Sequence, residues 1–403
     1  MTTSEPRSKG HTRLAADIRA LAAIERPSAS PGEEAAARWV RSRLRETGLQ
    51  AEIEEFQFNP AIGAVWGLHS LAALLSAALG LGVGRAPRLG AVLAAFTAAS
   101  FWGDATTEFH LMRRLLPKRP SYNVLARIPN PGARRIVIIS AHHDASHSGL
   151  VFHPWMLEQA TRIRGEASPP PLEIPLLSMI AISAAAALRG IGLRHRILRR
   201  SLVFGALLNA ALFALMQDVS RSPVSPCAND DASGVAVLLA LAEQFTIQPP
   251  ADLELWFLST GSEEGMLGGM SAFIERHGTE LEGRRPFVLN LEMAGSGRPV
   301  YLESEGFLRR HSYHQEAVEL ARAVSAEDEF EGVGSVAVAP FVSDALIATR
   351  HGIPAITIAS LNAAGYVPNY HWASDTPDNV DLRSVENTYA FCQRLLTRLA
   401  ERQ

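Results

Sequence analysis

The sequence has little of what would assign it to several familiar classes of protein. It has two cysteines, Cys227 and Cys392, which excludes a disulfide-stapled scaffold and a CxxC metal pair. Its formal net charge is −3, and it has no basic stripe with interleaved aromatic residues, so nothing indicates a nucleic-acid partner. The amino-terminal residues lack the apolar run of a secretory signal peptide. A chain of 403 residues allows two domains, or one domain with insertions.

Much of the chain alternates predicted helices with predicted strands. The run Ile136, Val137, Ile138 and Ile139 has no polar alternation, as expected of a buried strand in a parallel sheet. Strands are also predicted at 50–58, 252–260, 287–293 and 354–360, and helices at 12–24, 30–48, 230–245, 266–278, 344–352 and 383–398. This order predicts an α/β fold: a mostly parallel mixed sheet flanked by helices.

Four apolar segments interrupt this rhythm, in two pairs at 61–83 with 88–103 and 174–188 with 201–216. Each has about the length of a helix that spans a bilayer, or is slightly shorter. We therefore expect two inserted hairpins in a multi-pass membrane protein, with the lipid bilayer as a partner. The alternatives are buried core hairpins, or apolar helices that pack against another protein.

The membrane sidedness stays open. The loop of the second hairpin carries five arginines and should be cytoplasmic by the positive-inside rule, which would put the site and both termini outside. The Arg-rich amino-terminal region, without a signal peptide, would then need translocation. The arginines of this loop are Arg189, Arg194, Arg196, Arg199 and Arg200.

These boundaries divide the chain into five parts. The expected α/β domain comprises residues 1–60, 104–170 and 219–403, and the hairpins comprise 61–103 and 171–218. The α/β domain is thus interrupted twice, at positions far apart in the sequence.

Histidines and acids follow the ends of several predicted strands. The carboxyl ends of parallel strands lie at one edge of a sheet, so these groups should meet there. Such a cluster of acids needs a counter-charge, and oxygen with imidazole ligands suits zinc, or manganese or cobalt. A pair of ions with a bridging carboxylate fits better than one. The segments are SAHHDAS after 136–139, CANDDASG before a helix, STGSEEG, NLEM and YHWASDTPD.

These segments, in this order, resemble peptidase family M28, the zinc aminopeptidases and related metallopeptidases. The resemblance covers about 122–380 and is interrupted by the second hairpin. It implies a membrane-bound di-zinc exopeptidase that hydrolyses peptide substrates. Carried over residue by residue, it makes His142 and Glu292 ligands of the first metal, Glu264 and His371 ligands of the second, and Asp230 the bridging ligand.

The resemblance also assigns three supporting roles. Asp144 would accept the imidazole N–H of His142 and fix its tautomer. Glu263 would act as general base, and Tyr370 would stabilise the oxyanion. The chain departs from many relatives, which have Asp where it has Glu292, so a preference for amino- or carboxy-terminal residues is not implied.

Neighbouring residues have plainer interpretations. His143 and His147 are expected to line the loop or cleft, and Asp375 to be a turn residue. Asp231 is either a helix N-terminal charge or a ligand. Asp344 is either an N-cap or a group that supports a ligand.

Two other functions fit the same motifs. A glutaminyl-cyclase-like aminoacyl transferase of this fold would use one zinc, whereas five ligands favour two. A catalytically inactive, peptidase-like membrane receptor or scaffold would be expected to lack ligands or the base, and here none is missing.

Overall fold

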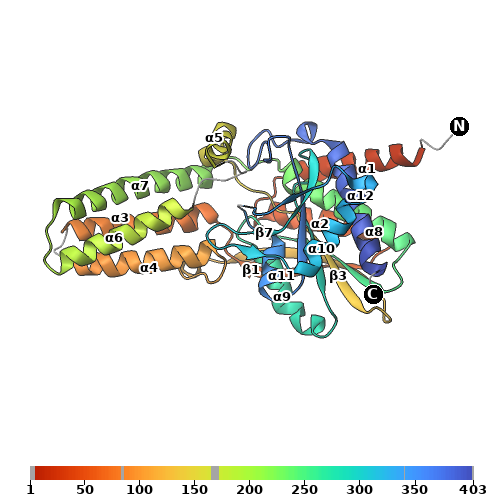
Figure 1. Cartoon of the computed structure of the whole chain (residues 1–403), viewed down its shortest axis with the longest axis horizontal. Helices are drawn as coiled ribbons and strands as arrows, with labels where there is room; N and C mark the ends of the chain where they lie inside the picture. The colour runs from red at the N-terminus through yellow and green to blue at the C-terminus, as the bar shows by residue number, and fades with distance from the viewer. Residues whose placement is uncertain (1–4, 83–85, 165–171, 340, 402–403) are drawn as a thin grey trace.

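The computed structural model describes residues 5–82, 86–164, 172–339 and 341–401. It shows an α/β part that holds both termini and a bundle of four helices that projects from one side of it (Figure 1). Val83, the last residue of the first expected apolar segment, lies outside the described residues, as does the expected boundary between 170 and 171.

An eight-stranded mixed sheet forms the centre of the α/β part. The central strands β4, β3, β5 and β10 are mutually parallel. β2 runs antiparallel to β4 and β1, and β6 runs antiparallel to β10 but parallel to the edge strand β9. β7 (Ser304–Glu305) and β8 (His311–Ser312) form a separate antiparallel pair. In spatial order the strands of the main sheet are β1 (Ala51–Phe58), β2 (Arg119–Ile128), β4 (Leu253–Thr260), β3 (Arg135–His142), β5 (Phe287–Leu291), β10 (Ala355–Leu361), β6 (Arg298–Leu302) and β9 (Gly334–Val336).

The parallel centre sets the position of the polar strand ends. β3 is buried along its whole length, as its continuous apolar run predicts. In the ladders, His142 lies opposite Thr260 of β4, and Ser140 lies opposite Asn290 of β5. The carboxyl ends of these strands therefore share one edge, and the predicted fold class is confirmed.

Helices cover both faces of the sheet (Figure 1). One face has α1 (Glu5–Ala22), α2 (Pro31–Glu46), α8 (Gly234–Ile247), α10 (Gln315–Ser325) and α12 (Leu382–Glu401), and the other has α9 (Gly268–Leu281) and α11 (Asp344–Arg350). The short helix α5 (Pro154–Arg164) lies beside the junction with the bundle.

The helix ends follow local chemistry. The Ser30 side chain accepts hydrogen bonds from the N–H groups of Gly32 and Glu33, so it is the N-cap that the sequence predicts for α2. The helix expected from residue 230 begins four residues later, because the backbone of Asp230 and Asp231 is not helical.

The two apolar hairpins pack together as one bundle. It consists of α3 (Ile62–Leu81), α4 (Pro87–Ala105), α6 (Glu173–Gly190) and α7 (Arg196–Arg221), with α3 against α7 and α4 against α6. Alanines make up most of its buried cluster, among them Ala73, Ala77, Ala94 and Ala186, and Phe101, Met179, Ile182 and Leu202 complete it. Small residues let helix backbones approach closely, which is typical of helix packing inside membranes.

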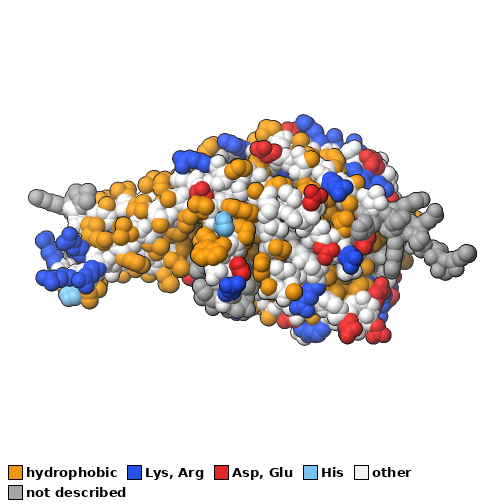
Figure 2. All heavy atoms as spheres, turned by 90° about the horizontal axis from the view of Figure 1, so that it is seen from above, with side chains coloured by type: hydrophobic (Ala, Val, Ile, Leu, Met, Phe, Trp, Pro, Cys, Tyr) orange, Lys and Arg blue, Asp and Glu red, His pale blue; other side chains and the backbone are white. Residues whose placement is uncertain are grey.

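The outer surface of the bundle carries large apolar side chains. Phe204 and Leu207 of α7 are 69% and 67% exposed, and Val92 of α4 is 67% exposed. Figure 2 shows this apolar band, with arginines gathered at the far tip. Among the described residues, α3, α6 and α7 are long and apolar enough to cross a membrane. α4, which contains Arg88 and Asp104, does not meet that standard, so four equivalent spans are not supported.

A buried ion pair joins the bundle to the α/β part. Asp104, at the end of α4, accepts hydrogen bonds from Arg113 Nε at 2.9 Å and from Trp66 Nε1 of α3 at 3.0 Å. The Arg113 guanidinium also donates to the main-chain oxygen of Asn59, which follows β1. Because all these groups are taken from water, their mutual hydrogen bonds fix the base of the bundle to the sheet.

Candidate metal centre

Five of the sequence-predicted residues meet at the carboxyl edge of the central strands. His142 ends β3, and Glu292 directly follows β5. Asp230 lies in the turn 228–233 before α8, Glu264 in the loop after β4, and His371 in the loop after β10. All five are buried or nearly so.

Asp230 lies between the two histidines. Its Oδ1 is 3.1 Å from His142 Nε2, and its Oδ2 is 3.1 Å from His371 Nε2. A further carboxylate accompanies each imidazole: Glu292 Oε2 is 3.6 Å from His142 Nε2, and Glu264 Oε1 is 3.0 Å from His371 Nε2. The arrangement therefore has two halves that share one carboxylate.

Asp144 organises three of these groups at once. Its Oδ1 is 3.4 Å from His142 Nδ1 and accepts the main-chain N–H of Glu263 at 3.1 Å. Its Oδ2 accepts the N–H of Glu264 at 3.2 Å and the hydroxyl of Ser28 at 2.6 Å. One carboxylate thus lies against the His142 ring and holds the backbone of both glutamates.

Burial and mutual repulsion dominate the electrostatics of the acids. Burial, with neighbouring carboxylates, raises the pKa of Glu263 and of Glu292 well above the ordinary value. Burial alone would lower the pKa of His371, but Glu264 and Asp230 outweigh it and raise that pKa to about 10. So many acids in one buried place require a cation.

The donor set fits a divalent metal. Glu264 Oε1 and both ring nitrogens of His371 are buried and form no hydrogen bond, although Glu264 Oε1 and His371 Nε2 lie only 3.0 Å apart. Nitrogen and carboxylate atoms converge within 4.8 Å of one another in two groups: His142 with Asp230 and Glu264, and His142 with Asp231 and Glu292. Imidazole and carboxylate without thiolate is the donor chemistry of catalytic zinc.

Comparison with known proteins supports the fold and matches part of the chain to a family. Residues 217–396 match the model of peptidase family M28. The match covers 180 of the 403 residues, just under half of the chain. Together with the fold, it supports a metallo-hydrolase, as the motifs imply. No curated protein matches the chain in sequence.

Solved structures resemble this chain at low sequence identity. An aminopeptidase from Aneurinibacillus sp. strain AM-1 has a TM-score of 0.55 at 16% identity, and the match covers 96% of this chain and 93% of that one. BSAP, a zinc aminopeptidase from Bacillus subtilis, has a TM-score of 0.56 at 13% identity, covering 96% and 94%. LapB from Legionella pneumophila has a TM-score of 0.55 at 13% identity, covering 99% and 76%. These likenesses establish a shared fold.

Sequence reasoning missed a carboxylate that shapes the candidate metal site. Asp375, expected to be a turn residue, accepts the main-chain N–H groups of Asn229 at 2.8 Å and of Asp230 at 3.1 Å. Its pKa is raised to about 7 because it is buried and close to Asp230. Its position four residues after the predicted ligand His371 could have indicated a role in the site. Its partner Asp230, however, lies 145 residues away in the sequence.

Glu33 was also missed. It reads as an acid in the first turn of α2, yet it is buried and accepts from the Ser121 hydroxyl at 2.6 Å and the Ser262 N–H at 3.2 Å. Burial and the charge of Asp144 raise its pKa to about 7. It anchors the start of the loop that carries Glu263 and Glu264.

The contacts of His143 and Asp344 bear on two more of the plainer interpretations. His143 does not line the cleft: it is fully buried, and its Nδ1 is 2.9 Å from Ser259 Oγ of β4. Asp344 is not an N-cap, because Ser343 holds that position. The Asp344 Oδ2 accepts a hydrogen bond from the Thr260 hydroxyl instead.

Asp231 accepts main-chain N–H groups from His142, Gly234 and Met293, so its side chain ties the turn to β3 and to the end of β5.

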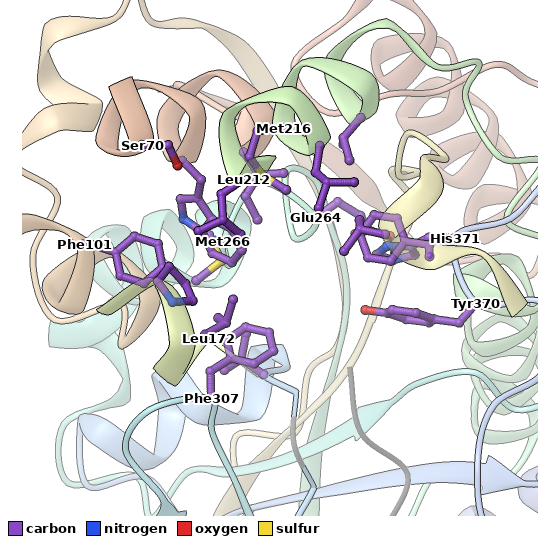
Figure 3. Close-up of a pocket in the computed structure, with 18 of the residues that line it drawn as sticks. Ser70, Phe101, Leu172, Leu212, Met216, Glu264, Met266, Phe307, Tyr370 and His371 are labelled. Atoms are coloured by element: carbon purple, nitrogen blue, oxygen red, sulfur yellow. Dashed lines mark ion pairs between the residues drawn. The ribbon is translucent and has the colours of Figure 1, made fainter. Parts of the chain in front are cut away.

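An apolar cavity of about 200 Å³ opens at the candidate metal site. Glu263, Glu264, Tyr370 and His371 line one end of it, and side chains of the bundle line the other. Figure 3 shows the Tyr370 ring beside His371 with its hydroxyl directed into the cavity. The two rings stack with centroids 3.8 Å apart. The tyrosine hydroxyl therefore faces the space that a substrate would enter.

Proposed function

We propose that this protein is a membrane-bound exopeptidase whose site holds two zinc ions. The observation that carries the proposal is the position of Asp230, whose two oxygens face two different histidines. His142 and Glu292 would complete one site, and Glu264 and His371 the other. A carboxylate shared in this way is the bridge that two-metal hydrolases use.

Bound zinc would polarise the substrate carbonyl and lower the pKa of the attacking water. The protein's own groups would perform the remaining steps. Glu263 Oε2, 3.9 Å from His142 Nε2 and at the cavity wall, would take the proton of the water and pass it to the leaving amine. The Tyr370 hydroxyl would donate a hydrogen bond to the carbonyl oxygen as negative charge develops on it.

The comparisons support removal of terminal residues, because the similar structures are named as aminopeptidases. A single-zinc cyclase fits less well, since each histidine has a second carboxylate of its own. An inactive receptor fits less well because ligands and base are all present and close together.

Metal analysis of Asp230→Asn tests the two-zinc proposal. The purified protein should contain close to two zinc ions per chain, and Asp230→Asn should lose both because the bridging group serves both sites. Asp328→Asn, at an exposed position of the same domain, is the matched control and should keep both ions. A single ion that survives Asp230→Asn would refute the shared bridge and favour the one-zinc alternative.

The membrane part of the proposal has its own support and its own test. α3, α6 and α7 are apolar, and the bundle shows large apolar side chains outward and mostly small ones inward. The protein should sediment with membranes, resist alkaline carbonate and leave them in detergent. Recovery as a monodisperse protein from a detergent-free lysate would contradict insertion.

A further inference from the structure

The cavity at the metal centre continues into the helix bundle. Its far wall consists of residues from four bundle helices, including Ser70 of α3, Phe101 of α4, Pro175 of α6 and Leu212 of α7. Figure 3 shows Ser70, Phe101 and Leu212 on the side away from His371. The inserted hairpins, which interrupt the peptidase domain in the sequence, thus build part of its substrate cavity.

We propose that this cavity holds the long acyl chain of an N-acylated amino acid or short peptide, with the scissile amide carbonyl at the metal centre. The inference rests on the proposed two-zinc hydrolase, because a peptide bond is itself an amide, and it names an acyl group in place of a terminal amino acid as the group that is removed. Water adds across the amide: the C–N bond breaks, a C–O bond forms, the acyl group leaves as a carboxylic acid, and the nitrogen takes a proton and leaves as the amine.

The depth of the cavity favours a chain longer than an amino acid side chain. Ile62 and Ser70, which both line it, are about 12 Å apart along α3 at roughly 1.5 Å per residue. Val219 and Leu212 are about 10 Å apart along α7 by the same rise. The walls therefore follow the bundle for about two helical turns.

The chemistry of the walls favours an acyl chain over a peptide arm. Three or more extended residues would fit that depth, at about 3.3–3.6 Å each, and would bring their N–H and C=O groups with them. Among the described residues on the bundle side of the lining, Ser70 and Trp66 carry polar side-chain groups, and Trp66 Nε1 already donates to Asp104. Buried backbone groups without partners are costly, whereas methylene groups need none.

The position of the cavity also suits an amphiphilic substrate. The helices that wall it are those whose outer faces are apolar, and Leu207 is on the same helix as the lining residue Leu212. A substrate that is anchored in a bilayer by its acyl chain would meet the protein at these helices. Its polar end would lie at the metal centre.

Alkyl hydroxamates test the proposal, since their head group binds zinc and their chain length can be varied. Binding is measured by calorimetry on the full-length protein in lipid nanodiscs, with probes of two, six and ten carbons. Each buried methylene should tighten binding by up to about fourfold. A flat dependence on chain length, with the two-carbon probe still bound, would overturn the acyl-chain proposal and leave the metal site standing.

A matched pair of substitutions locates the chain. Leu212→Trp fills the far end of the cavity and should weaken the ten-carbon probe at least tenfold while sparing the two-carbon probe. Leu207→Trp makes the same change on the outer face of the same helix, where the leucine is 67% exposed, and should leave both probes unchanged. Equal effects of the two variants would contradict binding in the cavity.

A measurement without metal separates this proposal from the proposed function. After chelator treatment, a decanamide with a photoreactive terminal carbon should cross-link to lining residues of α3 and α7, such as Ser70 and Leu212. Cross-links confined to outward residues such as Leu207 would refute the acyl site. Absence of zinc, together with no binding of the two-carbon hydroxamate, would refute the metallohydrolase, and the cross-links would still decide the acyl site.

Discussion

Glu263 and Glu264 are adjacent in sequence, but changing each to glutamine should have a different effect. One change should lower the zinc content and the other should lower turnover. The two side chains leave one short loop, and Asp144 holds the main-chain N–H of both. Glutamine keeps the size of the side chain and this backbone anchor. The comparison therefore isolates the carboxylate charge at two positions in the same loop.

The geometry gives the two acids different tasks. Glu264 Oε1 is 3.0 Å from His371 Nε2, as two ligands of one ion would be, so Glu264→Gln should lower zinc content and thermal stability. The nearest described imidazole nitrogen to Glu263 Oε2 is His142 Nε2, at 3.9 Å, and Glu263 borders the cavity. Glu263→Gln should keep its zinc and lose proton transfer, a loss of about 10² to 10⁴ in kcat.

Three measurements on each variant decide the assignment: zinc per chain, kcat on an aminoacyl anilide, and binding of a short hydroxamate. Glu263→Gln should show near-normal zinc and hydroxamate binding with collapsed turnover. If Glu263→Gln empties the site while Glu264→Gln keeps both ions, the two roles are reversed and the mechanism given above is wrong.

Two further predictions concern groups outside the ligand set. Asp375 accepts two main-chain N–H groups, and Asp375→Asn replaces one of its acceptor atoms with a donor. Zinc affinity should therefore fall about 10- to 100-fold although the ligands are intact. Unchanged zinc affinity in a chelator competition would contradict a positioning role. His277 has a raised pKa because Glu54 accepts its hydrogen bond at 2.8 Å. This pair should add about 1 kcal/mol of stability below pH 6.5, lost as pH rises through the raised pKa. The melting temperature of the parent should therefore fall relative to His277→Gln between pH 6 and 9, and parallel curves would refute this.

The fold and the metal residues follow from local patterns. The run Ile136 to Ile139 predicts a buried parallel strand, and parallel strands place their carboxyl ends at one edge, so His142 and Glu292 could be expected to meet. Ser30 before Pro31 predicts the start of α2 in the same local way. The ligand roles of these residues stay predictions until metal is measured.

The contacts that support the site depend on residues far apart in the chain. Nothing near Asp375 shows that it holds the turn before α8, and nothing near Glu33 shows that it lies under the glutamate loop. The inward faces of the bundle helices could not be predicted either. α3 is apolar on all sides, so periodicity does not show which face turns inward; the structure shows that small residues such as Ala73 and Ala77 do.

The buried Asp104–Arg113 pair has a consequence for which bonds the enzyme reaches. It fixes the base of the bundle to the sheet, and α3 is about 30 Å long by its helical rise, close to the thickness of a bilayer's hydrocarbon core. In a membrane, the metal centre would then stay at a constant height, just above the lipid headgroups. Such an enzyme selects its substrates first by how far they rise from the membrane: a bond near the surface can be cut, and the same bond on a freely diffusing or tall, folded protein would seldom reach the site.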